Sequence, residues 1–141
     1  MLVNTSKSPS ILLLNSLASV IPAPTRTLYA STKAASLMLY QALSIEHPKI
    51  AFSLCMPSTV QGDFRSSAVD VVGPINEGRE PNKQHGLKRE FVAQRCIEAI
   101  DKGEKTVFIP VTMRFAHLLY WIWPSLVESG ARRKYNFAVT K

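Results

Sequence analysis

Glycine-rich loops, long apolar runs and clustered metal ligands are all missing from this chain of 141 residues. Its six glycines are scattered, and neither G-x-x-x-G-x-G nor G-x-G-x-x-G occurs, so the sequence contains no loop of the kind that binds a dinucleotide pyrophosphate. The two cysteines, Cys55 and Cys96, and the three histidines stand far apart, a spacing that predicts neither a metal site nor a disulfide. We expect both cysteines to be small core residues.

Long apolar segments are also lacking. The most apolar and aromatic stretch, residues 115–127, is shorter than the roughly twenty residues that a membrane-spanning helix needs. The first ten residues have no basic stretch followed by an apolar core, so they do not resemble a signal peptide. We therefore expect an intracellular protein, in the cytoplasm or associated with the endoplasmic-reticulum membrane. The net charge of +7 is dispersed and no nucleic-acid motif accompanies it, which predicts a solvated basic surface and no nucleic-acid partner.

What is present is an alternation of apolar runs and helical patterns. It predicts a single α/β domain over residues 1–141, with a partial doubly wound parallel (Rossmann-like) sheet, right-handed crossovers, about three strands and three to four helices. The expected strands are residues 10–16, 50–55 and 106–110, and the expected helices are residues 27–46 and 87–102. Gly103 is expected to end the second helix in a left-handed conformation. The buried side of that helix is predicted to hold Phe91, Val92, Cys96, Ile97, Ala99 and Ile100.

Three side chains form a set with chemical meaning. Tyr29 and Lys33 stand four residues apart on the expected helix 27–46, which brings them onto one face about one turn apart. A lysine ammonium in that position favours the ionised form of the phenol. Ser16 ends the apolar run that begins at Ile11, so its hydroxyl is expected at the carboxyl end of a strand, where open α/β sheets bind ligands. A solvent-facing Tyr-Lys pair, with Ser16 only capping a turn, is the structural alternative.

Together these residues resemble the active-site motif of the short-chain dehydrogenase/reductase family. The resemblance covers Asn15-Ser16-Leu17-Ala18-Ser19 and Tyr29-Ala30-Ser31-Thr32-Lys33-Ala34-Ala35, followed by a strand that leads into Pro57. It implies an oxidoreductase that transfers hydride between NAD(P)H and a small carbonyl or alcohol substrate, which includes lipid-like molecules. In that scheme Tyr29 is the proton donor, Ser16 binds the substrate oxygen, and Lys33 binds the nicotinamide ribose and activates Tyr29.

The resemblance also implies cofactor contacts after the second strand. Pro57, Ser58 and Val60 fall where the family's loop holds the nicotinamide carboxamide with its backbone, so they join Tyr29 and Lys33 as predicted cofactor-binding residues. Two positions depart from the family pattern: Ser58 replaces a glycine, and Gly62 stands where a threonine is usual. Residues 65–86 are expected to form a loop over the substrate, and a surface insertion without function is the alternative. Residues 87–141 are expected to form the C-terminal helix, strand and apolar tail.

The resemblance covers only the C-terminal half of the family's domain. About ten residues precede the first strand, too few for the glycine-rich turn or for the family's catalytic asparagine. We therefore expect little activity from these residues alone. The family's dimer interface implies a homo-oligomer through the helix that carries Tyr29, with Ala34, Leu37 and Gln41 as its outer residues. Packing of these residues in the core is the alternative. Two other functions stay open: a non-catalytic module that pairs with a full-length relative, and a membrane-surface protein that uses residues 115–127 and the basic residues after them.

Overall fold

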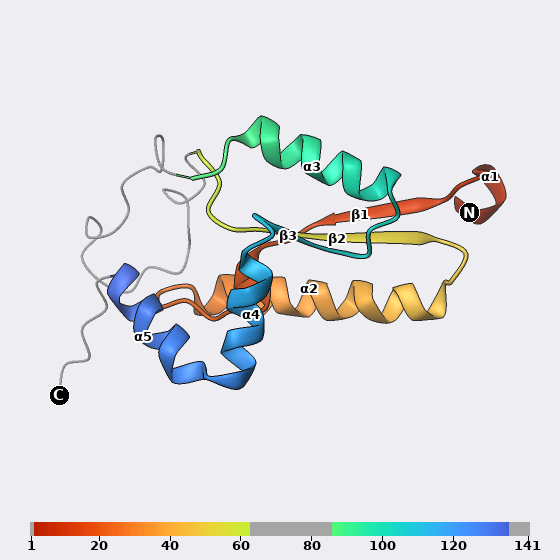
Figure 1. The fold of residues 1–141 in the computed structure, drawn as a ribbon. Helices are drawn as coiled ribbons and strands as arrows, with labels where there is room; N and C mark the ends of the chain where they lie inside the picture. Colours follow the sequence, from red (N-terminus) through yellow and green to blue (C-terminus); the bar gives the residue numbers. More distant parts are fainter. Residues whose placement is uncertain (1, 63–85, 136–141) are drawn as a thin grey trace.

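A computed structural model of the chain describes residues 2–62 and 86–135 (Figure 1). In this part of the chain, three strands alternate with four longer helices and two short helical turns. Their bounds are α1 (Leu2–Thr5), β1 (Ser10–Leu14), the 3-10 turn η1 (Leu17–Ser19), α2 (Thr27–Glu46), β2 (Ala51–Pro57), α3 (Arg89–Asp101), β3 (Thr106–Ile109), α4 (Met113–Ile122) and α5 (Pro124–Lys134). The predicted α/β class is confirmed. Helix α2 spans the predicted residues and ends before Pro48, which cannot continue it.

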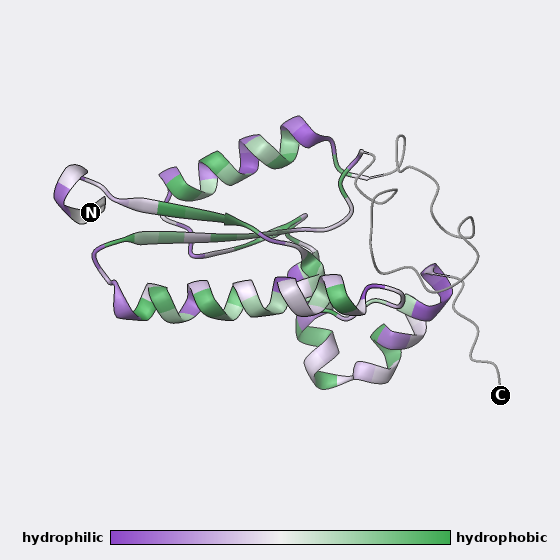
Figure 2. Ribbon diagram, turned by 180° about the vertical axis from the view of Figure 1, so that it is seen from behind, coloured by the Kyte–Doolittle hydropathy of each residue, from purple (hydrophilic) through white to green (hydrophobic). Residues whose placement is uncertain are grey.

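The three strands form one parallel sheet in the order β1-β2-β3. Leu14 of β1 lies opposite Cys55 of β2, and Pro57 of β2 lies opposite Ile109 of β3. The carboxyl ends of all three strands therefore meet at one edge of the sheet. Helices α2 and α3 cover its opposite faces (Figure 1), and the strands between them are the hydrophobic layer (Figure 2).

This arrangement corrects one expectation. With strands in the order β1-β2-β3, two right-handed crossovers would place both return helices on the same face of the sheet. Because α2 and α3 lie on opposite faces, the two crossovers have opposite hands, and one of them is left-handed. The rule rests on a twisted strand that leads into a helix packed back on the sheet. In the second crossover, residues 58–88 separate β2 from α3.

The core lies on both sides of β2, the most buried strand. On the α2 side, Leu37 packs with Leu54 and Met56. The α3 side is a larger cluster made of Cys55, Val92, Cys96, Ala99, Val107 and Ile109. The prediction that both cysteines are core residues is confirmed, and both are free thiols. Successive side chains of β2 point to opposite faces of the sheet, so this one strand contributes to both apolar layers.

The buried faces of the helices are narrower than the sequence pattern predicts. On α3, Val92, Cys96 and Ala99 are buried, whereas Phe91 and Ile97 are more than half exposed, so their predicted burial is wrong. Val92, Cys96 and Ala99 are spaced four and then three residues apart, so they form a single stripe along the helix. Phe91 and Ile97 project to either side of this stripe. On α2, Leu37 is 6% exposed and belongs to the core, so it is not an outer residue as expected.

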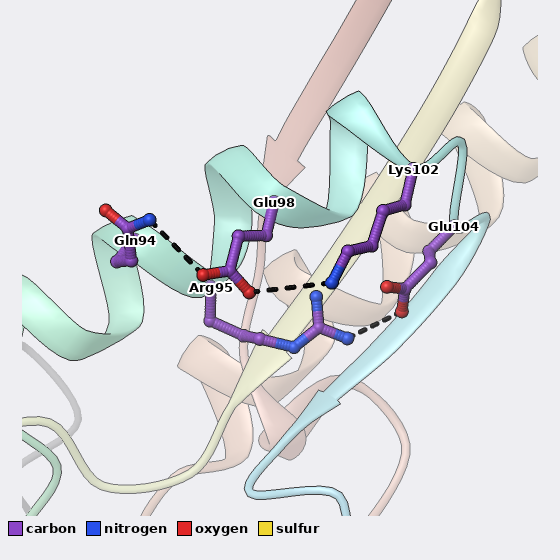
Figure 3. Close-up of polar contacts among 5 residues, drawn as sticks. All are labelled: Gln94, Arg95, Glu98, Lys102 and Glu104. Carbon is purple, nitrogen blue, oxygen red and sulfur yellow. Dashed lines mark hydrogen bonds and ion pairs between the residues drawn. The ribbon is translucent and has the colours of Figure 1, made fainter.

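A polar network on the outer side of α3 joins this helix to the segment before β3 (Figure 3). Arg95 donates a hydrogen bond to Glu104 at 2.6 Å, and this contact holds the pKa of Glu104 below its usual range. Glu98 accepts a hydrogen bond from Gln94 and lies 3.9 Å from the Lys102 ammonium. Such surface pairs contribute little stability each. Gly103 follows with a φ of 66°, the left-handed conformation predicted for it.

The C-terminal part of the described chain forms two helices. Helix α4 ends at Ile122, and Pro124 begins α5, a position that suits proline because the first helical residue needs no N–H partner. None of the helices that the structure describes has the length and apolar character that crossing a bilayer requires.

The buried thiols give a testable expectation. Burial, followed by the contact with Cys96, raises the pKa of Cys55 from 9.0 to about 12. Near pH 8 the native thiolate fraction should be about a thousandfold below that of an exposed cysteine, so labelling by Ellman's reagent should require unfolding. Between pH 9.0 and about 12, only the unfolded chain ionises this thiol, so the free energy of unfolding should fall as pH rises. Rapid labelling of both thiols in the native protein would contradict this account.

Candidate proton-transfer site

The first half of α2 holds the predicted pair. Tyr29 and Lys33 are both half-buried, and the Lys33 ammonium nitrogen lies 5.8 Å from the centre of the Tyr29 ring. This distance is within the range of a cation–π contact. Hydroxyl groups of the same helix bind the neighbouring carbonyls: Thr32 donates to the Tyr29 carbonyl at 2.8 Å, and Ser36 donates to the Lys33 carbonyl at 3.1 Å. The structure therefore brings a positive charge next to the phenol.

Ser16 follows the carboxyl end of β1, as predicted, although the strand itself ends at Leu14. The residue is half-buried and caps the short turn η1, with its hydroxyl oxygen accepting the Ala18 N–H at 3.2 Å. A serine hydroxyl is both a donor and an acceptor. The hydrogen of Ser16 can therefore still be donated to the oxygen of a ligand while the cap is in place.

Asn15 joins these two parts of the site. It is 5% exposed, and its side-chain amide donates to the Lys33 carbonyl at 3.0 Å. Its side-chain oxygen accepts the Ser16 N–H at 2.9 Å, and its own backbone N–H donates to the Cys55 carbonyl at 2.8 Å. One buried side chain thus connects the residue that carries the serine hydroxyl to the helical turn that carries Tyr29 and Lys33. The bonds of Asn15 place Ser16 and the Lys33 turn at the same end of the sheet, where β1 ends.

Sequence reasoning gave Asn15 no role. A signal was nevertheless available, because a single amide ends a run of apolar residues directly before Ser16. Buried polar side chains are nearly always hydrogen-bonded, so a polar residue at such a position indicates a tertiary partner. The sequence could not identify that partner, since Lys33 lies eighteen residues away and contributes its backbone carbonyl.

The predicted cofactor loop lies at the end of the neighbouring strand. Pro57 is buried at the last position of β2, and the Ser58 N–H donates to the Ile109 carbonyl at 2.8 Å. That N–H is therefore not available to a nicotinamide carboxamide. Val60 forms an isolated parallel bridge with Leu87, in which the Leu87 N–H donates to the Thr59 carbonyl and the Gln61 N–H donates to the Leu87 carbonyl. This pattern directs the backbone groups of Val60 away from Leu87.

A depression of about 250 Å³ lies between the turn after β1 and α2. Its walls are small or apolar side chains: Ala18, Ser19, Val20, Pro22, Ala30, Ser31 and Ala34. Ser16, Tyr29 and Lys33 do not line it, so it is a neighbour of the site. Residues 65–85 of the predicted substrate loop lie outside the described residues. Within the described ranges, no three histidine, cysteine, aspartate or glutamate side chains gather where they could hold a metal ion.

Comparison with known proteins adds no assignment to this geometry. No family model matches the chain, and no curated protein matches it. The interpretation of the site therefore depends on the motif and on the contacts just described.

Removing the Asn15 amide should separate the two halves of the site. Asn15→Ala leaves the Ser16 N–H without its side-chain partner and removes one of the two side-chain donors, Asn15 and Ser36, from the Lys33 carbonyl. We expect the free energy of unfolding to fall by about 1–3 kcal/mol. Urea unfolding measures this loss. Ser44→Ala is the matched control, because it removes a hydrogen bond within α2 alone, from Ser44 to the Gln41 carbonyl. Its effect should be within about 0.5 kcal/mol, and equal losses in the two variants would contradict the role of Asn15.

Proposed function

We propose that Ser16, Tyr29 and Lys33 form the proton-transfer site of an NAD(P)-dependent oxidoreductase that interconverts a small-molecule carbonyl and its alcohol. The observation that supports this most is the hydrogen bond from the buried Asn15 amide to the Lys33 carbonyl. It joins the serine at the end of β1 to the Tyr29–Lys33 turn of α2, and a solvent-facing Tyr-Lys pair would need no such connection.

The chemistry follows from what each group can donate. NAD(P)H would supply the hydride to the carbonyl carbon. Tyr29 would give its phenolic proton to the carbonyl oxygen as charge develops there, and would recover a proton from water. Ser16 would donate a hydrogen bond to the same oxygen and stabilise the transition state. Lys33, with its ammonium 5.8 Å from the Tyr29 ring centre, would stabilise the phenolate left after proton transfer.

The residues present suit one end of the cofactor. Lys33 lies at the carboxyl edge of the sheet, where it could bind ribose hydroxyls, and the Val60 backbone could meet the carboxamide. Ser58 could contribute its hydroxyl but not its N–H, which binds Ile109. The 141 residues contain no glycine-rich pyrophosphate loop. We therefore propose that these residues alone have little turnover and weak affinity for NAD(P)H.

Substitution of the proton donor tests the site. In the native protein, assayed with NADH and NADPH on simple ketones and alcohols, Tyr29→Phe should lower kcat by about 10²–10⁴-fold, the usual contribution of a general acid. Its cofactor affinity should stay near that of the parent, whereas Lys33→Ala should lower both. Tyr40→Phe is the matched control, because it removes a phenol from the same helix without touching the motif. Equal activity of Tyr29→Phe and the parent would refute the proposal.

The intact mass of the native product shows which form to assay. A species of about 30 kDa or more, the size of a full domain of this class, would carry the dinucleotide-binding part, and catalysis should be measured on it. The 141-residue chain alone should neither bind NADPH at micromolar concentration nor reduce carbonyls. Micromolar binding together with turnover by that chain would contradict the proposal that these residues supply the proton-transfer groups without the main cofactor-binding part.

A second candidate function is suggested by the edge strand. Within the described residues, β1 is the first strand of the sheet, and Leu14 is 53% exposed at its end. Leu14 is paired with Cys55, but the hydrogen bond to the Cys55 carbonyl comes from the Asn15 N–H. In a parallel pair this means that the N–H and C=O of Leu14 point away from β2, toward the free edge. Such an edge can accept a strand from a full-length relative. A non-catalytic module of this kind should co-purify with that relative without turnover.

A charge on the edge strand tests this alternative. Leu14→Lys should abolish the co-purification, because charges at sheet edges prevent strand pairing. Ile97→Lys, at a similarly exposed position on α3, should leave the co-purification intact. Loss of co-purification in both variants, or in neither, would exclude pairing through β1.

A further inference from the structure

Helix α4 carries an apolar stripe on its outer side. Phe115, Leu118, Leu119 and Ile122 follow the i, i+3, i+4, i+7 spacing of one helix face, and their side chains are between 38% and 81% exposed. The helix is nevertheless docked on the fold, because His117 stacks on Phe108 of β3 with ring centres 5.6 Å apart. The stripe therefore faces outward in a helix whose other side is already packed.

Three more exposed apolar residues lie on α4, at the junction of the two helices and in the first turn of α5. Trp121 is 77% exposed, Trp123 is 59% exposed, and Leu126 is half exposed. We call these three residues and the stripe the hairpin surface. Single exposed apolar side chains are normal on a soluble protein, but a contiguous group of large ones marks a contact site.

Basic residues flank the hairpin surface along the chain. Arg114 is exposed on α4, and three exposed basic residues, Arg132, Arg133 and Lys134, form the last turn of α5. Between residues 111 and 135 the one acidic side chain is Glu128. Figure 2 shows the change from hydrophobic residues on α4 to hydrophilic ones at the end of α5. Apolar and aromatic groups on the same helix pair as a basic cluster match the acyl chains and headgroups of an anionic lipid layer.

We propose that the hairpin surface docks the protein peripherally on an anionic membrane, with Phe115, Ile122 and the two tryptophans at the lipid interface and the basic turn against the headgroups. Helices of ten and eleven residues lie on a bilayer and do not cross it. A second copy of the chain is a poorer occupant, because it would bring the same four cations together in a chain whose net charge is already +7. Lipid contact also suits exposed tryptophan, which concentrates at membrane interfaces.

Tryptophan fluorescence of the full 141-residue chain reports on this surface alone. The chain has two tryptophans, and both belong to the hairpin surface. Phosphatidylcholine vesicles that contain phosphatidylserine should shift the emission to the blue and sediment with the protein, whereas vesicles of phosphatidylcholine alone should bind it much more weakly. Raised salt should weaken the binding, since it screens the charge term.

Two sets of variants separate the apolar and the charge contributions. Phe115→Ser with Leu118→Ser should weaken binding to the anionic vesicles at least about tenfold, because two large side chains no longer enter the lipid. Neutralising the last turn of α5 (Arg132→Gln, Arg133→Gln and Lys134→Gln) should weaken it about a hundredfold, or about fivefold for each charge. Leu28→Ser with Leu39→Ser, a pair of similarly exposed leucines on α2, is the matched control and should bind as the parent does. Far-UV circular dichroism verifies that each variant is folded.

Three results would overturn the proposal. One is a folded parent protein that shows neither a spectral shift nor sedimentation with anionic vesicles. Another is equal weakening by the α2 control pair, which would mean that any exposed apolar group binds the lipid. The third is a blue shift that grows with protein concentration without vesicles, with a matching dimer in sedimentation velocity, since a second copy would then cover the hairpin surface.

Discussion

The hydrogen bond between the Asn15 side chain and the Lys33 carbonyl is the constraint on which the candidate site depends. Strand β1 and helix α2 are separate layers held by apolar burial, which is non-directional. A buried amide that must satisfy its donors and acceptor adds a directional constraint, because losing a partner in the interior is costly. The same side chain accepts the Ser16 N–H, so it fixes the position of Ser16 relative to the helical turn that carries Tyr29 and Lys33.

This constraint acts at the end of the sheet where the functional features gather. The parallel strands bring Asn15, the segment after Pro57 and the start of α4 to one edge. Helix α4, which carries most of the hairpin surface, begins four residues after β3 and lies at that same end of the fold (Figure 1). If the hairpin surface rests on a membrane, the candidate site would lie at the end of the fold that faces the lipid. A substrate that partitions into the bilayer could then reach the site without crossing much water.

The sequence predicted what local chemistry determines. The apolar runs indicated all three strands, the spacing of Tyr29 and Lys33 indicated a shared helix face, and Gly103 indicated a left-handed helix end. Interactions between distant segments could not be predicted in the same way. The partner of Asn15 is a backbone carbonyl, which carries no sequence signal, and the choice of Val92 over Phe91 for burial depends on how α3 lies on the sheet. The opposite hands of the two crossovers depend on which face α3 takes. Sequence patterns alone do not determine that choice.

The most direct test of the account is nuclear magnetic resonance of the Asn15 side-chain amide in the 141-residue chain. A hydrogen bond to the Lys33 carbonyl should protect these amide protons from exchange with water, and should produce nuclear Overhauser contacts to the protons of the Lys33 turn. Exchange at the rate of an exposed asparagine, without contacts to α2, would contradict the account. Ser16 would then have no fixed relation to Tyr29 and Lys33, and the three residues would not form one site.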